Sequence, residues 1–169
     1  MASVLRFRAL RPPHHRAEAI ASVPYDVVDS SEAAALAQGK PWSFLHVIRP
    51  EIDLPPDTNL YSEPVYQQAR QTLERFLSEA PYSGDAPCMM IYRLVLDGRA
   101  QVGVVAACSV DEYDDGRIAI HERTRQAKED DRTRHVDTLG AHTGPVFLTC
   151  RDTGELTGLQ RALMTGDPT

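Results

Sequence analysis

The first third of the chain contains short stretches in which apolar and polar side chains alternate, the pattern of a strand with one buried face. Residues 3–10 alternate in this way, a cluster of prolines and histidines at 12–15 interrupts the pattern, and it resumes over 17–23. An apolar run at 43–48 is typical of a buried strand. We therefore expect three strands in this part, the first of them an edge or lead-in strand.

Two stretches have helical spacing instead. A serine at position 30 or 31 suits the N-cap of a short helix that runs through Gln38 and ends before Gly39. Pro64 suits the first turn of a second helix. The apolar residues of that helix recur at helical spacing and are Tyr66, Ala69, Leu73, Phe76, Leu77 and Ala80. This second helix is the clearest amphipathic element of the sequence.

A β-hairpin is the strongest prediction for the second half of the chain. Apolar runs at 88–96 and 100–109 flank Asp97-Gly98, a dipeptide favoured where both central turn residues need positive φ. The pairing set by this turn puts Cys88 opposite Ala107. The three cysteines are odd in number and lack CxxC spacing, so a disulfide framework or zinc knuckle is disfavoured and we expect buried thiols.

The order of elements predicts the fold class. Residues 145–150 form a last apolar run, expected as a buried strand, and the residues after Asp152 are weakly patterned. Strands and helices are mixed along the chain, which favours an α+β fold with a mixed, largely antiparallel sheet and a few packed helices in a single domain. We expect this domain to span 1–152, with a weakly structured segment and a truncation point at 153–169.

The bulk composition limits the class of protein. With 169 residues, of which 42% are hydrophobic and 25% charged, the chain suits one domain with a real core. No apolar run approaches the roughly 20 residues of a membrane-spanning helix. The N-terminus lacks a signal-peptide pattern, so we expect a cytoplasmic protein. A net charge of -6 disfavours general attraction to nucleic acid or an anionic membrane, so any basic site is local.

Residues 121–135 consist almost entirely of functional groups. If this segment is helical, five potential cations share one stripe, at spacings of four, three, four and three: His121, Arg125, Lys128, Arg132 and His135. Like charges on a stripe repel, unless carboxylates compensate them or the stripe faces an anion. Phosphate is the anion that arginine and lysine most often hold.

Other familiar chemistries fit the sequence less well. His121-Glu122 resembles the start of the HExxH zinc motif, but Arg125 stands where the second histidine is needed, and a guanidinium does not bind zinc. The sequence contains no GxSxG, Walker loop or GxGxxG, and no cysteine lies in a basic setting that would activate it. A phosphate site would have to be built from the charged segment itself.

Two interpretations of this segment stay open. In the first it is an anion site, whose clamps would be Arg123, Arg125, Lys128, Arg132 and Arg134. In the second it is a solvated helix held by pairs within the helix. We favour the site because only Ala127 and Val136 would bury, so packing alone does not explain the segment. Turn chemistry or capping explains the loop residues Tyr25, Asp26 and Arg49 at least as well as a site does. The second-tier candidates are Tyr25, Asp26, His46, Arg49, His135 and His142.

Several blocks, in order, resemble the N-terminal half of the bacterial and archaeal domain of unknown function 1015 (DUF1015) family. They are residues 7–12, 21–28, 43–47, 49–51, 121–125, 128–132 and 144–148, and the match spans most of 5–152. Members of this family are longer, and their later half carries an Asp-Gly-His-His-Arg motif similar to that of free-serine kinases in the ParB/sulfiredoxin superfamily. The resemblance therefore implies a truncated member with an incomplete kinase-type site.

The expected function is binding of a nucleotide or phosphorylated small metabolite, with phosphoryl transfer to a small hydroxyl compound such as serine. Glu122, beside His121, would be the base, Asp131 and Glu129 would bind Mg²⁺, and ATP or ADP would be the cofactor. The alternative is a non-catalytic module that docks a partner, or a missing C-terminal half, through the charged face, which predicts self-association. A nucleic-acid-associated regulator ranks last because the chain is acidic.

Overall fold

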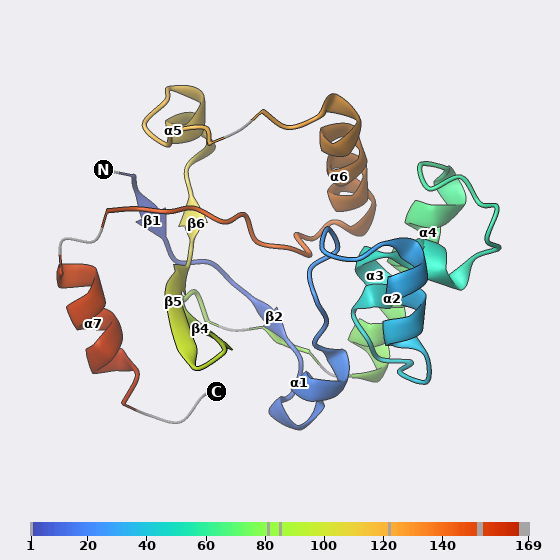
Figure 1. The fold of residues 1–169 in the computed structure, drawn as a ribbon, viewed down its shortest axis with the longest axis horizontal. Helices are drawn as coiled ribbons and strands as arrows, with labels where there is room; N and C mark the ends of the chain where they lie inside the picture. The colour runs from blue at the N-terminus through green and yellow to red at the C-terminus, as the bar shows by residue number, and fades with distance from the viewer. Residues whose placement is uncertain (1, 81, 85, 122, 152–153, 166–169) are drawn as a thin grey trace. The chain divides into compact units, whose positions relative to one another are not determined.

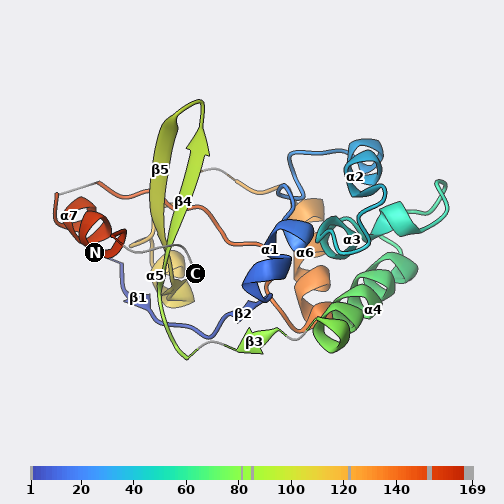
Figure 2. The same ribbon diagram turned by 90° about the horizontal axis from the view of Figure 1, so that it is seen from below.

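The computed structural model describes residues 2–80, 82–84, 86–121, 123–151 and 154–165. The chain forms two compact units, each built from segments distant in sequence. Unit 1 comprises residues 1–10, 84–122 and 145–169, and unit 2 comprises 11–83 and 123–144 (Figures 1 and 2). Helices and short antiparallel strands occur together, which confirms the α+β class.

Unit 2 is helical. Its elements are α1 (His14–Ile20), α2 (Ser30–Ala37), α3 (Leu45–Ile48), the 3-10 helix η1 (Pro50–Asp53), α4 (Glu63–Glu79) and α6 (Gln126–Leu139). The predicted helices at 30–38 and from 62 are confirmed. The N-cap of α2 is Asp29 rather than a serine, and its side chain forms a capping box with Glu32. Gly140, with φ of 63°, ends α6 in the left-handed conformation.

The core of unit 2 lies between these helices. Phe76 and Leu73 of α4 pack with Val47 of α3, and all three side chains are buried. A second cluster joins Ala33 and Ala37 of α2 to Leu45 and Ile48 of α3. As the spacing predicts, the inner face of α4 is buried, except that Leu77 is 38% exposed. Helix α6 packs along α4, so α4 contacts helices on two sides (Figure 2).

Two strands expected in this region are helices, so those predictions were wrong. Residues 17–23 lie largely in α1, and the apolar run at 43–48 includes α3. A short apolar run fits a buried strand and a buried helical turn equally well, because a stretch of six residues is too short to reveal a period. As a helix, this run buries Leu45, Val47 and Ile48 between α2 and α4.

Unit 1 contains the strands β1 (Val4–Leu5), β4 (Met90–Leu96), β5 (Arg99–Val105) and β6 (Ala107–Cys108), with the helices α5 (Val110–Asp114) and α7 (Glu155–Leu163). Strands β4 and β5 form the predicted antiparallel hairpin, with Leu96 opposite Arg99. Asp97 and Gly98 have φ of 49° and 76°, as that turn requires. Two further short strands, β2 (Leu10–Arg11) and β3 (Ser83–Gly84), form a separate two-stranded sheet.

The remaining predictions for unit 1 need correction. Cys88 pairs with Phe7 rather than Ala107, because the hairpin ladder stops at Met90 and the pairing of β1 with β6 takes over. The cysteines are free, as expected, but they are not the buried thiols predicted: Cys88 and Cys108 are half-buried and Cys150 is exposed. Residues 145–150, expected as a strand, have no regular structure, and the region from 153, expected to be weakly structured, includes α7.

The units differ in burial. Every hydrophobic residue that is buried in the described part of the chain belongs to unit 2, whereas in unit 1 only Glu112 and Gln160 are buried. Glu112 accepts hydrogen bonds from the backbone and side chain of Ser3 at 2.6 and 2.8 Å, and Arg117 donates to it at 2.9 Å. These hydrogen bonds therefore connect α5 to the N-terminal segment of the chain. No described helix has the length and apolarity needed to cross a membrane.

Candidate functional site on helix α6

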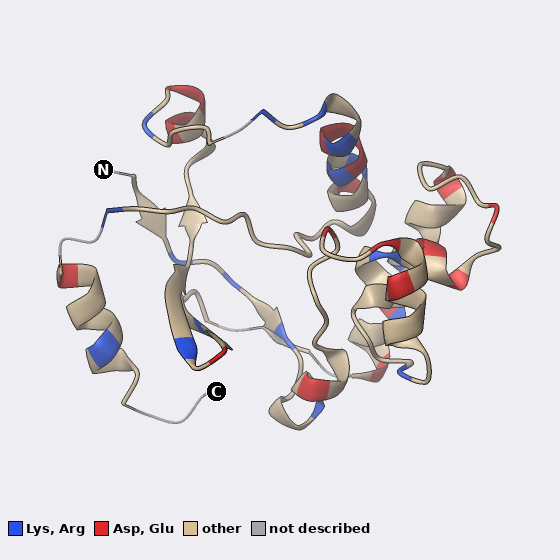
Figure 3. Ribbon diagram, in the orientation of Figure 1, with Lys and Arg blue, Asp and Glu red and all other residues tan. Residues whose placement is uncertain are grey.

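Helix α6 begins at Gln126, so the first part of the charged segment is not helical. Its N-cap residue, Arg125, has extended φ and ψ, and no side chain caps the helix. Arg123, Arg125 and Lys128 are exposed, and within the described chain none of them forms an ion pair with a carboxylate. The result is a group of basic side chains at the positive end of a helix (Figure 3).

The inner face of α6 is polar, and it is buried. Asp131 and His135, one turn apart, are 8% and 2% exposed, whereas Ala127 is exposed. The expectation that only apolar residues would bury was therefore wrong. Tyr66 of α4 donates a hydrogen bond from its hydroxyl to Asp131 Oδ1 at 2.8 Å. Burial, and then this bond, raise the pKa of Tyr66 to about 12.

His135 fixes α6 to a second helix of unit 2. Its Nε2 lies 3.0 Å from the carbonyl oxygen of Val47 in α3, and since a carbonyl only accepts, Nε2 carries the proton that is donated. Burial of the ring lowers the pKa of His135 below its ordinary value. A second-tier site candidate is thus a structural link between α6 and α3.

Arg132 is engaged in the same network. It donates to Asp131 Oδ2 from Nη2 at 2.7 Å and from Nε at 3.0 Å, and its guanidinium lies 4.3 Å from the ring centroid of Tyr25. Both carboxylate oxygens of Asp131 therefore have donors within the protein. Arg132 and Asp131, predicted to bind phosphate and Mg²⁺, thus have hydrogen-bonding partners within the protein.

Arg134 lies on the side of α6 that faces the start of α4. It pairs with Glu63, donates to the carbonyl oxygen of Tyr61 at 3.3 Å, and lies 4.4 Å from the centroid of the Tyr66 ring. A pocket of about 250 Å³ opens here, lined by Tyr61, Tyr66, Ala127, Asp130, Asp131 and Arg134. Sequence reasoning missed Tyr61 and Glu63, because no local pattern relates residues that lie about seventy positions from their partners.

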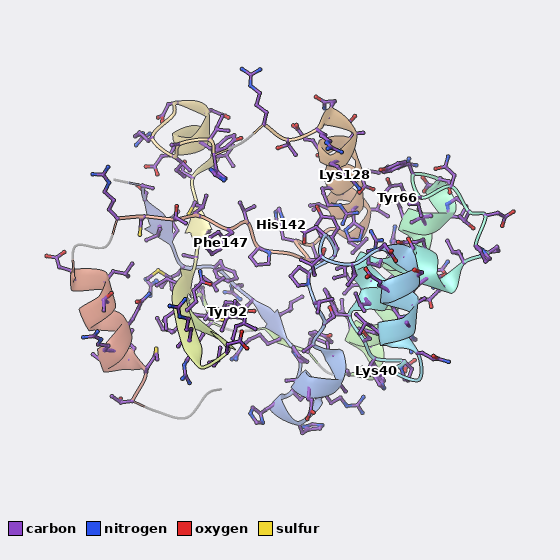
Figure 4. All side chains as sticks on the ribbon, viewed as in Figure 1. Lys40, Tyr66, Tyr92, Lys128, His142 and Phe147 are labelled. Atoms are coloured by element: carbon purple, nitrogen blue, oxygen red, sulfur yellow. The ribbon has the colours of Figure 1, made fainter. Side chains whose placement is uncertain are left out.

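Lys128 lies between this pocket and the basic N-terminal end of the helix. Its Nζ lies 5.9 Å from the centroid of the Tyr61 ring, and Figure 4 shows Lys128 on α6 with Tyr66 nearby on α4. Asp130, on the pocket wall, accepts a hydrogen bond from the side chain of Gln126 at 2.8 Å. Asp130, Asp131 and Arg134 thus line the pocket, whereas the cations that form no ion pair within the described residues lie just before α6 and in its first turn.

The other second-tier candidates of unit 2 lie in separate surroundings. His46 Nδ1 is 2.9 Å from both carboxylate oxygens of Asp53, and Nε2 is 3.2 Å from the carbonyl of Lys40. Hydrogen bonding to Asp53 raises the pKa of His46. Arg49 Nε lies 3.1 Å from a carboxylate oxygen of Glu51, which also accepts from Ser30 at 2.9 Å. Both clusters stabilise the segment from α2 to η1, which includes α3.

Several other predicted site residues are not part of the hydrogen-bond network of α6 in the described part of the chain. His121 is exposed and belongs to unit 1, whereas α6 belongs to unit 2. Glu122, the predicted base, lies outside the described residues. Asp26, Glu129 and His142 are exposed. Among the residues that the structure describes, no three histidine, cysteine, aspartate or glutamate side chains are grouped to hold a metal ion.

The sequence profile of a family described as a protein of unknown function (DUF1015) matches residues 4–168. The chain therefore belongs to this family, as its sequence blocks indicate. No curated protein and no solved structure matched the chain.

Proposed function

We propose that unit 2 binds the phosphate group of a nucleotide or a phosphorylated small metabolite at the N-terminal end of α6. The observation that carries this proposal is the set of three exposed cations, Arg123, Arg125 and Lys128, at a helix end that no side chain caps. The same end presents backbone N–H groups that have no partner within the helix.

An anion would resolve an electrostatic conflict at this end of α6. A helix N-terminus carries about half a positive charge, so basic side chains there oppose the helix dipole and cost stability. The acidic residue of the first turn is Glu129, which is outnumbered by the cations around it. A phosphate would accept hydrogen bonds from the backbone N–H groups of Gln126 and Ala127 while pairing with the arginines.

The proposed division of labour differs from the one that the sequence predicts. Arg123, Arg125 and Lys128 bind the phosphate, whereas Arg132 and Asp131 hold α6 against α4. Phosphoryl transfer to a small hydroxyl compound, with Glu122 as base and ATP or ADP with Mg²⁺ as cofactor, stays a prediction. Mg²⁺, where it takes part, would arrive with the nucleotide phosphates, as is common for this ion.

Isothermal titration calorimetry with inorganic phosphate, ATP, ADP and phosphoserine tests the proposal. We expect at least one of these ligands to bind the wild-type chain, and the variant Arg125→Gln to bind it about 10-fold or more weakly, because a charge-assisted hydrogen bond is lost. The double variant Arg123→Gln, Arg125→Gln should lose measurable binding.

A matched control removes a cation elsewhere in unit 2. Arg70 lies on α4, is exposed, and among the described residues pairs only with Glu74 one turn away, so Arg70→Gln should leave the affinity unchanged. If none of the four ligands binds, or if Arg70→Gln weakens binding as much as Arg125→Gln, phosphate recognition at α6 is wrong. Circular dichroism of each variant confirms that the helices are intact.

The second candidate function is docking of another protein chain. The observation that favours it lies in unit 1, where large hydrophobic residues of the hairpin are exposed, among them Leu94 at 49% and Leu96 at 76%. Exposed apolar patches of this kind mark interaction surfaces. The docking surface would then be the apolar hairpin of unit 1, in place of the charged segment.

A further inference from the structure

The tripeptide Asp-Gly-Arg occurs twice in unit 1, at residues 97–99 and at residues 115–117. In an Asp-Gly pair the backbone nitrogen of the glycine can attack the side-chain carboxyl group of the aspartate, and glycine has no Cβ to obstruct the approach. Because the two tripeptides have the same sequence, a difference in their reactivity would come from the structure around them.

The tripeptide at 115–117 is held by hydrogen bonds at both reacting groups. Asp115 Oδ1 accepts from the backbone N–H of Arg117 at 3.1 Å, and Oδ2 accepts from the Arg117 Nε at 2.8 Å. The amide N–H of Gly116 donates to the carbonyl oxygen of Tyr113 at 3.2 Å. The bonds from the side chain and then the backbone of Arg117 lower the pKa of Asp115, so this carboxyl group is rarely in the protonated form from which water leaves.

The tripeptide at 97–99 lacks these bonds. Asp97 and Gly98 form the exposed turn between β4 and β5 (Figure 2). Within the described part of the chain, the Asp97 carboxylate accepts no hydrogen bond and forms no ion pair, and the Gly98 amide donates no hydrogen bond. Both reacting groups of this turn are therefore available.

We propose that Asp97-Gly98 is a site of spontaneous aspartate isomerisation. The backbone nitrogen of Gly98 attacks the side-chain carboxyl carbon of Asp97, so that an N–C bond forms, a C–O bond breaks, and the carboxyl hydroxyl leaves with the amide proton as water. One water molecule then opens the resulting five-membered succinimide at either of its two C–N bonds. Opening at the side-chain carbonyl restores aspartate, whereas opening at the main-chain carbonyl gives isoaspartate, with no net gain or loss of atoms.

Ring closure requires the turn to leave its hairpin conformation transiently, and unit 1 opposes this opening only weakly. In the described part of the chain β4 pairs with β5 alone, and Leu96 beside the turn is 76% exposed. A lone two-stranded hairpin is only marginally stable in water, and exposed segments with few buried contacts open locally at low free-energy cost. The reactive conformation is therefore accessible without unfolding of unit 2.

The rearrangement would change the hairpin. In isoaspartate the main chain runs through the Cβ and Cγ atoms of residue 97, which adds one carbon atom between Leu96 and Arg99, the pair that closes the turn. The two-residue turn sets the register of both strands, so a longer turn no longer fits the ladder. The modified chain should therefore have a hairpin that is loosened at its tip.

Incubation of the whole chain at neutral pH in water enriched in heavy oxygen tests the proposal. Each passage through the succinimide adds one heavy oxygen atom, and electron-transfer fragmentation of peptides digested in ordinary water locates the isoaspartate. We expect isoaspartate to accumulate at Asp97 at least about 10-fold faster than at Asp115, because one unit of carboxyl pKa changes the protonated fraction by about that factor.

The unfolded chain is the first control, because in guanidinium chloride the two tripeptides should react at nearly equal rates. In the folded chain Arg117→Gln should accelerate the reaction at Asp115 and leave the rate at Asp97 unchanged. Asp97→Glu should abolish the reaction at the turn, since ring closure would need a six-membered ring, and leave Asp115 unaffected. Circular dichroism of each variant shows whether the fold is intact.

Two results would overturn the proposal. One is isoaspartate that forms in the folded chain as fast at Asp115 as at Asp97. The other is its absence from Asp97 over the time in which the unfolded chain reacts. The aged chain should also exchange its β4 amide protons faster than the fresh chain, and unchanged exchange would contradict the loosened hairpin. The measurement involves no ligand, so its outcome is independent of the phosphate site proposed for α6.

Discussion

Unit 2 buries its apolar side chains, whereas unit 1 exposes them. In unit 2, Val47, Phe76 and Ala69 have no exposed surface, while in unit 1 Phe147 and Leu96 are about three-quarters exposed. Unit 1 has the larger share of hydrophobic residues, so composition does not explain the difference. Helices of unit 2 cover one another on several sides, but the single hairpin of unit 1 has two faces and two edges to cover.

The difference indicates where the stability of this chain resides. Burial of apolar area is the main favourable term in folding, so unit 2 should account for most of the free energy of unfolding. Unit 1 is held by a short ladder and by the hydrogen bonds around Glu112. The following predictions test this contrast.

The largest effect is expected from a cavity in unit 2. Phe76→Ala should lower the free energy of unfolding by about 3–5 kcal/mol, because Phe76 is fully buried against Val47 and Leu73. Leu94→Ala in the hairpin should cost less than about 1 kcal/mol in dilute solution. Urea unfolding followed by circular dichroism measures both. Equal losses would show that unit 1 has a core as important as that of unit 2.

The second largest effect is expected from the buried hydrogen bonds of Asp131 on α6. Asp131→Ala removes the acceptor of both Tyr66 and Arg132, and we expect a loss of roughly 2–4 kcal/mol because buried donors are left unpaired. Asp131→Asn, which keeps an acceptor for the Tyr66 hydroxyl, should cost less. The neighbouring control Asp130→Ala, at an exposed position, should change stability by no more than about 0.5 kcal/mol. If Asp131→Ala left the free energy of unfolding unchanged, the proposed role of these hydrogen bonds would be contradicted.

The hairpin turn offers a smaller effect within unit 1. Gly98 has φ of 76°, where a Cβ is strained whatever the space around it, so Gly98→Ala should destabilise the hairpin by about 1–2 kcal/mol. Gly103 lies in β5 at a negative φ with no atom within 4 Å of an added Cβ, so Gly103→Ala should be neutral or slightly stabilising. Hydrogen exchange of the β4 amides measures both. Equal effects would contradict the turn geometry.

The smallest effects on stability are expected from the ionisation of two histidines, whose pKa values should shift in opposite directions. His135 has a pKa lowered by burial, so it costs no stability above pH 6.5 and destabilises the folded state as pH falls from 6.5 through its lower folded pKa. His46 has a pKa raised by Asp53, so its contribution is complete below pH 6.5 and is lost as pH rises through its higher folded pKa. NMR titration of the imidazole carbons, assigned with His46→Gln, measures the order, and a reversed order would contradict both environments.

Local sequence patterns predicted those elements that local chemistry fixes. The Asp97-Gly98 turn set the register of the hairpin, and the spacing from Tyr66 to Phe76 set the buried face of α4. The same patterns failed at 43–48, because a largely apolar run of six residues is too short to specify a period. For the candidate site, the basic cluster before and within α6 could be found from sequence, but its separation into exposed and engaged cations could not.

That separation depends on partners far away along the chain. Asp131 is buried because Tyr66, 65 residues away, donates to it, and His135 is buried because Val47, 88 residues away, accepts from it. By itself, the sequence determined the α+β class, the hairpin, helices α2 and α4, and the presence of a local excess of cations in an acidic chain. Only the tertiary structure decided which polar side chains become part of the interior, because burial of a polar group depends on a hydrogen-bonding partner that local sequence does not encode.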